Sequence, residues 1–179
     1  MDSNTIRLSD GRDLLIRQAE ASDAGALLKH LEAMCTESNF TTWKPGEFRL
    51  TEDEEAQLME QYRSAETKVF MVAIIDEDIV GTLSFSGGDR TRLRHRGEFG
   101  VGVRRHAWGN GIGGLLMDAL IAWARDGDII KKINLRVRVD NKRAVGLYRR
   151  RGFVLEGTIS REIAVDGNYF SVHCMGLDL

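Results

Sequence analysis

Residues 99–124 read FGVGVRRHAWGNGIGGLLMDALIAWA. The stretch begins as an apolar, strand-like run, passes through a basic, glycine-rich turn and continues as an amphipathic helix. Glycine has no Cβ, so a backbone that contains several glycines can approach a ligand closely. A helix that begins inside such a turn directs unpaired N–H groups and a partial positive charge toward the same place. The stretch therefore predicts a binding site for a phosphate or pyrophosphate group.

The sequence on both sides of this stretch predicts one α/β domain over residues 1–179. Apolar residues at helical spacing indicate four helices, which begin near Ser22, at Thr51, after the glycine-rich turn and near Asn141. Thr51 followed by Glu54 is the pattern of a capping box, which opens the second, very acidic helix. Turn residues between apolar runs indicate hairpins. The predicted strands are residues 5–8, 14–17, 69–75, 79–86, 98–103, 133–139, 153–165 and 169–177.

The composition is that of an ordinary soluble globular protein, with 42% hydrophobic and 29% charged residues in a chain of 179. A chain of this length can bury a substantial core. No apolar run approaches the ~20 residues of a membrane span, and the polar N-terminus does not resemble a signal peptide. Two cysteines, Cys35 and Cys174, are expected to be free thiols in a reducing compartment. We therefore expect a cytoplasmic protein that does not bind membranes.

The net charge of −2 conceals an asymmetry along the chain. Residues 1–89 contain 8 Lys and Arg against 18 Asp and Glu, whereas residues 90–179 contain 17 against 9. Ordinary solvated faces explain this imbalance as well as a C-terminal half that attracts a polyanion. Nucleic acid is a poor candidate for that polyanion, because a pI near 6.1 lacks the overall basicity of a nucleic-acid-binding domain.

Two other phosphate-binding motifs fit the glycine-rich turn poorly. A P-loop needs Gly-Lys followed by Ser or Thr, and residues 113–115 offer neither the lysine nor the hydroxyl. Gly109, Gly111 and Gly114 do match the spacing of a dinucleotide-binding fingerprint. However, residues 104–108 separate the strand from the first glycine, where that fingerprint has a tight turn, and only one further helix follows. Neither a P-loop nor a Rossmann domain is expected.

The whole pattern resembles the GCN5-related N-acetyltransferase (GNAT) family. The first motif of that family is Q/R-x-x-G-x-G/A at the start of a long helix; Gly111 and Gly113 match it, and Trp108 stands where the family has Gln or Arg. The second motif, N-x-x-A-x-x-L-Y-x-x-x-G-F, is intact at residues 141–153. The resemblance covers nearly all of the chain in element order. It implies a single-domain GNAT-like α/β fold, with a mixed, mostly antiparallel sheet, helices on both faces and a splayed pair of cofactor-binding strands.

The resemblance also implies a site for acetyl-CoA as the acetyl donor. Backbone N–H groups of the turn would wrap the pyrophosphate without the help of a particular side chain, so Trp108 affects one contact and not the cradle. The pantetheine arm would pair with the splayed strand like an added strand. No metal is expected, because the histidines lack ligand spacing. The residues expected to bind the cofactor are Val101, Gly102, Val103, Arg104, Trp108, Gly109, Asn110, Gly111, Ile112, Gly113, Gly114, Asn141 and Tyr148.

Acetyl transfer to an amine needs a neutral amine and a protonated leaving thiolate. By resemblance Tyr148 is the general acid, with its phenol directed at the sulfur; the alternative is a core aromatic that only packs. Glu98 is the expected general base, because a partly buried carboxylate there would have a raised pKa. His95 and a water molecule stay open as alternatives. A backbone N–H near Val103 is expected to meet the oxyanion.

The expected function is direct acetyl transfer from acetyl-CoA to a primary amine, which belongs to a small amine, a polyamine, an amino acid or a protein N-terminus. The loop at 37–50 and the acidic helix at 51–64 are expected to decide which. The acids at 52–55 could attract a polyamine or a cationic peptide, or simply complement the helix dipole. Two other functions stay open: a CoA-binding sensor or interaction module without turnover, and an RNA-associated protein. A homodimer is also left open.

Overall fold

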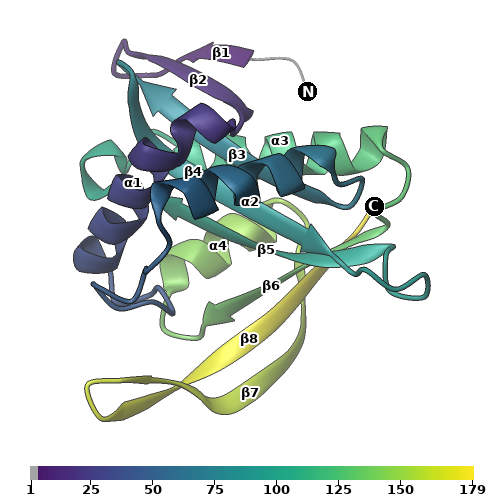
Figure 1. Ribbon diagram of the computed structural model, residues 1–179. Coiled ribbons are helices and arrows are strands. Elements are labelled where there is room, and N and C mark those ends of the chain that lie inside the picture. The colour runs from purple at the N-terminus through teal and green to yellow at the C-terminus, as the bar shows by residue number, and fades with distance from the viewer. Residues whose placement is uncertain (1–3) are drawn as a thin grey trace.

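The computed structural model describes residues 4–179, which form one eight-stranded sheet with helices on both faces (Figure 1). The sheet order is β1-β2-β3-β4-β5-β6-β8-β7, and every neighbouring pair is antiparallel except β5 and β6, which are parallel. This is the mixed, mostly antiparallel sheet that the sequence predicts. The strands are β1 (Asn4–Arg7), β2 (Asp13–Gln18), β3 (Lys68–Ile75), β4 (Asp78–Gly87), β5 (Arg96–Val103), β6 (Lys132–Arg138), β7 (Val154–Val165) and β8 (Asn168–Asp178).

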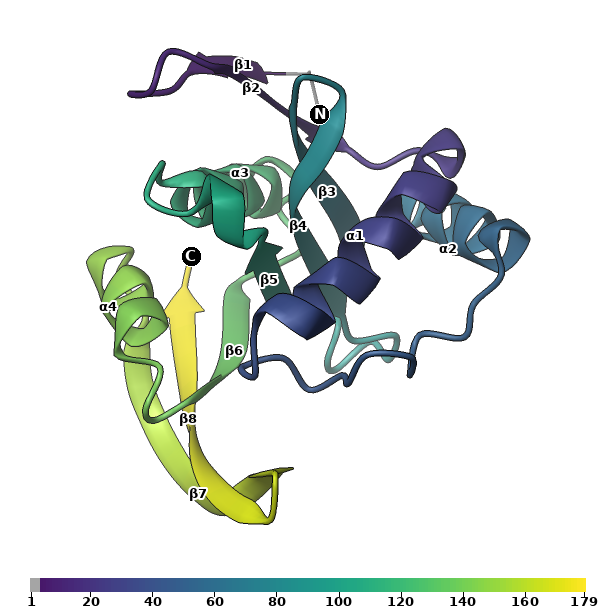
Figure 2. The ribbon, with the colours of Figure 1, turned by 90° about the vertical axis from the view of Figure 1, so that its left-hand side faces the viewer.

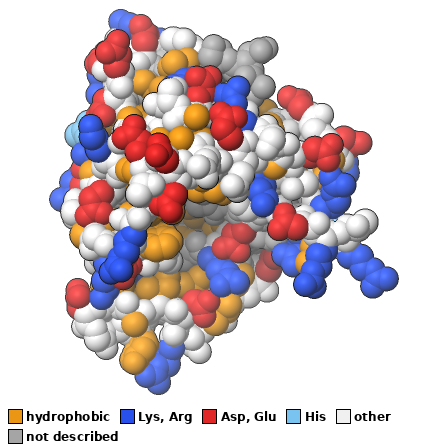
Figure 3. Space-filling view, viewed as in Figure 1, with side chains coloured by type: hydrophobic (Ala, Val, Ile, Leu, Met, Phe, Trp, Pro, Cys, Tyr) orange, Lys and Arg blue, Asp and Glu red, His pale blue; other side chains and the backbone are white. Residues whose placement is uncertain are grey.

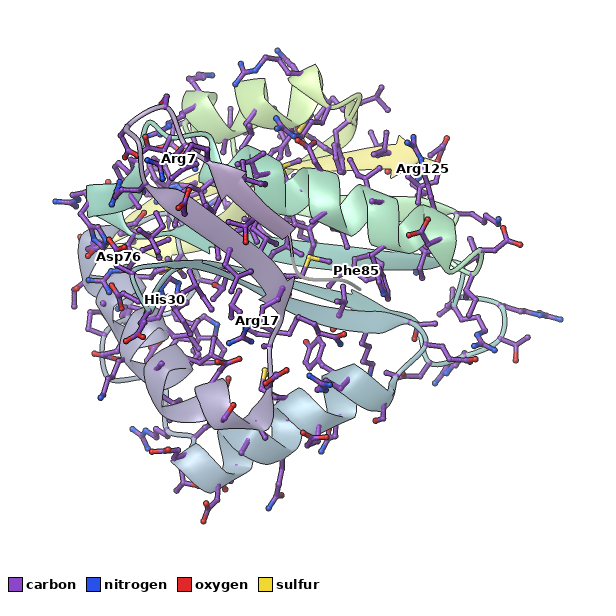
Figure 4. All side chains as sticks on the ribbon, turned by 90° about the horizontal axis from the view of Figure 1, so that it is seen from above. Arg7, Arg17, His30, Asp76, Phe85 and Arg125 are labelled. Carbon is purple, nitrogen blue, oxygen red and sulfur yellow. The ribbon has the colours of Figure 1, made fainter. Side chains whose placement is uncertain are left out.

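Helices α1 (Ala24–Glu37) and α2 (Glu52–Ser64) cover one face of the sheet, and α3 (Ile112–Asp126) and α4 (Lys142–Arg150) cover the other (Figure 2). The larger core cluster lies on the α3 side and contains Phe85, which Figure 4 shows between α3 and the strands. The smaller cluster lies on the α2 side, where Leu27 and Met59 pack with Phe70. Helices on both faces were also predicted, so the layer order is confirmed.

The start of α1 differs from the prediction. The helix was expected to begin at Ser22, but a short 3₁₀ turn, η1 (Ala21–Asp23), precedes it. The carboxylate of Asp23 accepts hydrogen bonds from the Arg17 guanidinium at 2.7 Å and from the Glu20 backbone N–H at 2.7 Å. These bonds hold the chain in a tighter turn than an α-helix, because they satisfy local donors before the helix begins.

β5 and β6 part after a short seam. They pair only where Arg96–Glu98 lie beside Lys132–Asn134, although β5 continues to Val103 and β6 to Arg138. The splayed strand pair predicted from the sequence is therefore present. The register between β4 and β5 is continuous, so Gly102 does not mark a bulge. It marks a close approach instead, since an added Cβ would lie 2.2 Å from the sulfur of Met34 on α1.

Among residues 4–179, no helix combines the length and the apolar character that crossing a membrane requires.

Candidate active site

A cleft of about 1560 Å³ opens where β5 and β6 part. One end is lined by the last residues of β5, the glycine-rich turn and α4, and the other by α2 and the loop between α1 and α2. Figure 3 looks onto the hollowed face, where hydrophobic side chains lie between rims of acidic and basic ones. The two sequence motifs, at 108–114 and 141–153, meet in this one space.

The glycine-rich turn has the geometry of a backbone cradle. Gly109 and Gly111 have φ of 94° and 75°, which only glycine adopts without strain, and an added Cβ at either would meet nothing within 4 Å. Gly111 is the N-cap of α3. The first intrahelical donors are Gly114 and Leu115, so the backbone N–H groups at 111–113 find no acceptor within the described part of the chain. This leaves open space and free donors together, as an anionic group requires.

Gly114 serves a different purpose from the other glycines of the turn. A Cβ there would lie 2.1 Å from the guanidinium of Arg151. That guanidinium donates to the Gly114 carbonyl at 3.1 Å and to the Asp118 carboxylate at 2.8 Å, and so ties the end of α4 to α3. Gly114 borders the cleft, but its lack of a side chain is explained by this packing rather than by a ligand.

The outer half of β5 offers unused backbone groups to the cleft. Arg104 N–H donates to the Val80 carbonyl, and Gly88 N–H donates to the Arg96 carbonyl, so even-numbered residues of β5 bond to β4. In an antiparallel pair the intervening residues direct their N–H and C=O groups to the other side. For Val101 and for the N–H of Val103 that side is the gap left by β6, whereas the Val103 carbonyl accepts a hydrogen bond from the Trp108 side chain. An extended ligand with amides can pair there as an added strand.

Trp108 explains how the turn manages without the family's Gln or Arg. Its indole N–H donates to the Val103 carbonyl at 2.7 Å and so fixes the turn to the end of β5. The ring is 42% exposed, and the guanidinium carbons of Arg105 and Arg143 lie 5.8 and 5.1 Å from its centre. Trp108 and Arg143 both line the cleft. The side chain therefore holds the cradle in shape.

Arg104 and Asn110 do not line the cleft, and their part in cofactor binding stays a prediction. Arg104 Nε pairs with Glu37 Oε1 at 2.9 Å, and the Arg105 backbone N–H donates to Glu37 Oε2 at 2.6 Å. The Asn110 amide donates to the Ala107 carbonyl at 3.4 Å. Because Glu37 ends α1, these arginines fasten that helix to the turn. The Arg104 charge is paired with the Glu37 carboxylate, and the Arg105 guanidinium donates to the Glu37 backbone carbonyl.

Tyr148 lies on α4 at the cleft and is 8% exposed. Its ring packs edge-to-face against Phe99, with centroids 5.9 Å apart, and next to Phe153. Burial raises the pKa of the Tyr148 phenol to about 12, so the hydroxyl carries its proton at neutral pH. Asn141 caps α4 by accepting the Ala144 N–H at 3.2 Å and also lines the cleft. Tyr148 therefore packs in the core through its ring and also lines the cleft.

Glu98 lines the cleft but is not partly buried as expected. Its side chain is 51% exposed, and Oε2 lies 3.6 Å from Nε of Arg136. Arg136 also donates to Glu162 at 3.1 Å. The partial burial expected of Glu98 is therefore not found. His95 is exposed, and it does not line the cleft.

Glu55 was predicted only as one of the acids at 52–55 that could attract a cation, and Tyr62 was not predicted to line a site. Glu55 lies on the inner face of α2 together with Tyr62, and the hydroxyl of Tyr62 lies 3.0 Å from that of Ser86 on β4. The helical spacing of Glu55 with Leu58, Met59 and Tyr62 was the available signal, because it places Glu55 on the apolar stripe of α2. Because Glu55 is the last of four consecutive acids, its position on the apolar stripe was not recognised.

The known proteins that this chain resembles in sequence and in fold are acetyltransferases. A model of the "Acetyltransferase (GNAT) family" matches residues 30–153, more than half of the chain. The L-amino acid N-acetyltransferase AaaT of Escherichia coli (strain K12) is 32% identical over 105 residues, which are 59% of this chain and 65% of that protein's length, less than two thirds.

Two solved structures are similar in fold. An acetyltransferase of the GNAT family from Streptococcus pneumoniae superposes with a TM-score of 0.91 at 31% identity, over 93% of this chain and 99% of the other. The Salmonella typhimurium protein yncA, solved with its cofactor acetyl-CoA, superposes with a TM-score of 0.80 at 19% identity, over 93% and 94% of the two chains.

Proposed function

Because the chain belongs to the GNAT family of acetyltransferases, which use acetyl-CoA, we propose that it transfers an acetyl group from acetyl-CoA directly to a primary amine. The observation that carries this proposal is the meeting of three features in one cleft: the glycine cradle, the free edge of β5 and the hydroxyl-bearing ring of Tyr148. We also propose that residues 1–179 act as one such domain.

The residues present fit acetyl-CoA. The open space over Gly109 and Gly111 and the free N–H groups at 111–113 suit a pyrophosphate. The N–H and C=O of Val101 and the N–H of Val103 are free edge groups for the amides of a pantetheine arm. Arg143, beside Trp108, adds a cation at the same end of the cleft. Acetyl-CoA supplies the activated acetyl thioester, and the chain supplies its orientation.

Tyr148 is proposed to hold the proton that the departing thiol sulfur needs. With a pKa of about 12 the phenol remains protonated until negative charge develops next to it. Glu98, at the start of the splayed segment, is proposed to accept the proton of the amine, directly or through water. The Val103 N–H is the proposed donor to the oxyanion. Arg136 lies 3.6 Å from Glu98 and donates its hydrogen bond to Glu162.

The test of the proposal is release of free thiol from acetyl-CoA in the presence of a panel of amines: polyamines, amino acids, aminoglycosides and peptides with free N-termini. Turnover with at least one class, together with a mass increase of that amine by one acetyl group, is expected. If acetyl-CoA raises the melting temperature while no amine is acetylated, the chain is a CoA-binding module and the proposal is wrong. Tight RNA retention at low salt that weakens steeply with added salt would favour the RNA-associated alternative.

A further inference from the structure

Glu55 is a buried carboxylate without a partner. Its side chain is 1% exposed, and the cleft lies against it. Within residues 4–179, no side-chain hydrogen bond or ion pair reaches the carboxylate, and burial alone raises its pKa. The carboxylate oxygens of Glu55 have no hydrogen-bond partner among the described residues, yet neither is completely buried. The small exposed area of the residue therefore belongs to the carboxylate. The group is therefore aimed into the cleft.

The fold itself does not explain this carboxylate. A buried ionised group is unfavourable unless a cation or several donors compensate it. The helix dipole of α2 is already complemented by exposed acids at 52–54, and Glu54 closes the capping box with Thr51. The next inward positions on the same stripe, Leu58 and Met59, are apolar. A positive charge brought by a ligand would compensate Glu55.

Two arginines of β6 that line the cleft are engaged with acids, and Arg49, in the loop before α2, lines it as an exposed side chain. Arg136 is shared between Glu98, at 3.6 Å, and Glu162, at 3.1 Å. Arg138 is buried, and its guanidinium binds both oxygens of Asp140, at 3.0 and 2.6 Å. An acceptor that enters this end of the cleft meets a free acid on the inner face of α2 and, on β6, two arginines already bound to acids. Arg49 also lines the cleft, but it is exposed, so water and salt screen its charge, whereas Glu55 is buried. A cation is favoured over an anion there.

The space between Glu55 and strand β5 has apolar walls and a floor that carries hydroxyl groups. Apolar side chains line it from three elements, and hydroxyl groups of β4 lie on its floor. An alkyl chain suits such walls, because its methylene groups gain by leaving water. The apolar lining residues are Leu31, Met34, Leu58 and Phe70, and the hydroxyl-bearing floor residues are Thr82, Ser84 and Ser86.

We propose that Glu55 binds a second positive charge of the acceptor, so that the preferred acceptor is a diamine or polyamine with an alkyl spacer rather than an amino acid. This inference rests on the proposed acetyl transfer. The reacting amine must lose its charge before it attacks, whereas the distant ammonium keeps its charge and pairs with Glu55. Glu55 is thus an acceptor-binding residue, and its effect belongs in KM.

The experiment compares acceptors that differ only at the far end: 1,5-diaminopentane, 1-aminopentane and 5-aminopentanoate, together with shorter and longer diamines. The wild-type protein should prefer the diamine of optimal length over the monoamine of the same length by about 30-fold or more in kcat/KM, the lower limit for a buried charge pair. The aminocarboxylate should be the poorest acceptor. Glu55→Gln should remove the diamine preference, so that the ratio of kcat/KM for diamine and monoamine falls to about one, mainly through a higher KM for the diamine.

Glu60→Gln is the matched control, because Glu60 lies on the same helix but is exposed and does not line the cleft. It should behave as wild type. A diamine preference that survives Glu55→Gln, or an equal loss for all three acceptors, would overturn the inference. If Glu55→Gln does not fold, the wild-type ratio decides alone, and equal kcat/KM for diamine and monoamine overturns it. Absence of turnover with every amine would instead defeat the proposed acetyl transfer.

Discussion

Tyr148 combines a packed ring with a hydroxyl that opens on the cleft, and these two properties can be separated by removing one oxygen atom. Tyr148→Phe keeps the contacts with Phe99 and Phe153, so the melting temperature and the affinity for acetyl-CoA should stay close to wild type. If the hydroxyl protonates the leaving sulfur, kcat should fall about 10²-fold or more. Steady-state kinetics with a saturating amine measures this.

The loss should be smaller with an acetyl thioester whose thiol is more acidic, since that thiolate leaves with less help. Tyr169→Phe, an exposed tyrosine on β8, provides the control. A folded Tyr148→Phe enzyme with full kcat would show that the residue is only a core aromatic and that water or another side chain protonates the sulfur.

His30 on α1, labelled in Figure 4, makes stability depend on pH. It is 2% exposed, its Nδ1 lies 2.8 Å from the Ile79 carbonyl, and burial lowers its pKa to about 4 from the usual 6.5. Between these two values the unfolded chain takes up a proton that the folded chain does not. Stability supplied by neutral His30 is therefore complete above pH 6.5 and is lost progressively as the pH falls to about 4, by about 3 kcal/mol.

Urea unfolding at pH 7 and at about pH 4 measures this loss. In His30→Gln the loss on acidification should be smaller by about 3 kcal/mol, whatever the stability of the variant at neutral pH. The exposed His95→Gln should show the wild-type slope. Equal losses in wild type and His30→Gln would mean that other groups cause the acid sensitivity.

The glycine-rich turn can be tested as an element. Acetyl-CoA should raise the melting temperature, because it binds the folded state alone. Gly111→Glu should abolish that rise, since it places a side chain and a negative charge where the pyrophosphate is proposed to lie. Gly167→Glu is a matched control: Gly167 also has positive φ, with open space around it, in the β7–β8 turn away from the cleft. A normal rise in a folded Gly111→Glu protein would place the phosphates elsewhere.

Strand β5 carries its own internal control. Val101 and Val103 direct their backbone N–H groups into the gap, whereas Gly100 and Gly102 bond to β4. If the donor pairs with this edge, acetyl-CoA should slow amide hydrogen exchange at Val101 and Val103 and leave Gly100 and Gly102 nearly unchanged. Exchange measured by NMR resolves single residues. Equal protection of all four amides would indicate general tightening of the strand and not pairing.

Local patterns determine the elements well, and long-range contacts explain the rest. The capping box at Thr51, the hairpin turns and the two motifs each depend on residues close in sequence, so the element order and the layers were predictable. The contact of Arg104 with Glu37 could not be predicted, because Glu37 lies 67 residues away and spacing does not reveal such a partner. Glu98 was predicted to be partly buried, and its exposure depends on strands that follow much later in the chain.

Across the whole molecule, the cleft draws on nearly every element after β2. Which acid faces it could have been predicted from the helical stripe of α2, but that Glu55 has no partner depends on the complete set of neighbours. The role of Gly114 likewise requires the position of Arg151, which reaches it from the far end of α4. Secondary structure could be predicted from the sequence, whereas charge pairs between residues far apart in the chain could not.

The short seam between β5 and β6 has a consequence for cutting the chain. Residues up to Gly127 form β1 to β5 and α1 to α3, and the residues after it form β6 to β8 and α4, so the chain crosses the seam once, at an exposed turn. A break between Gly127 and Asp128 would yield two fragments that share one core across the parting strands. Reassembly of such fragments should become tighter with acetyl-CoA, which would make the protein a ligand-dependent fragment-complementation pair.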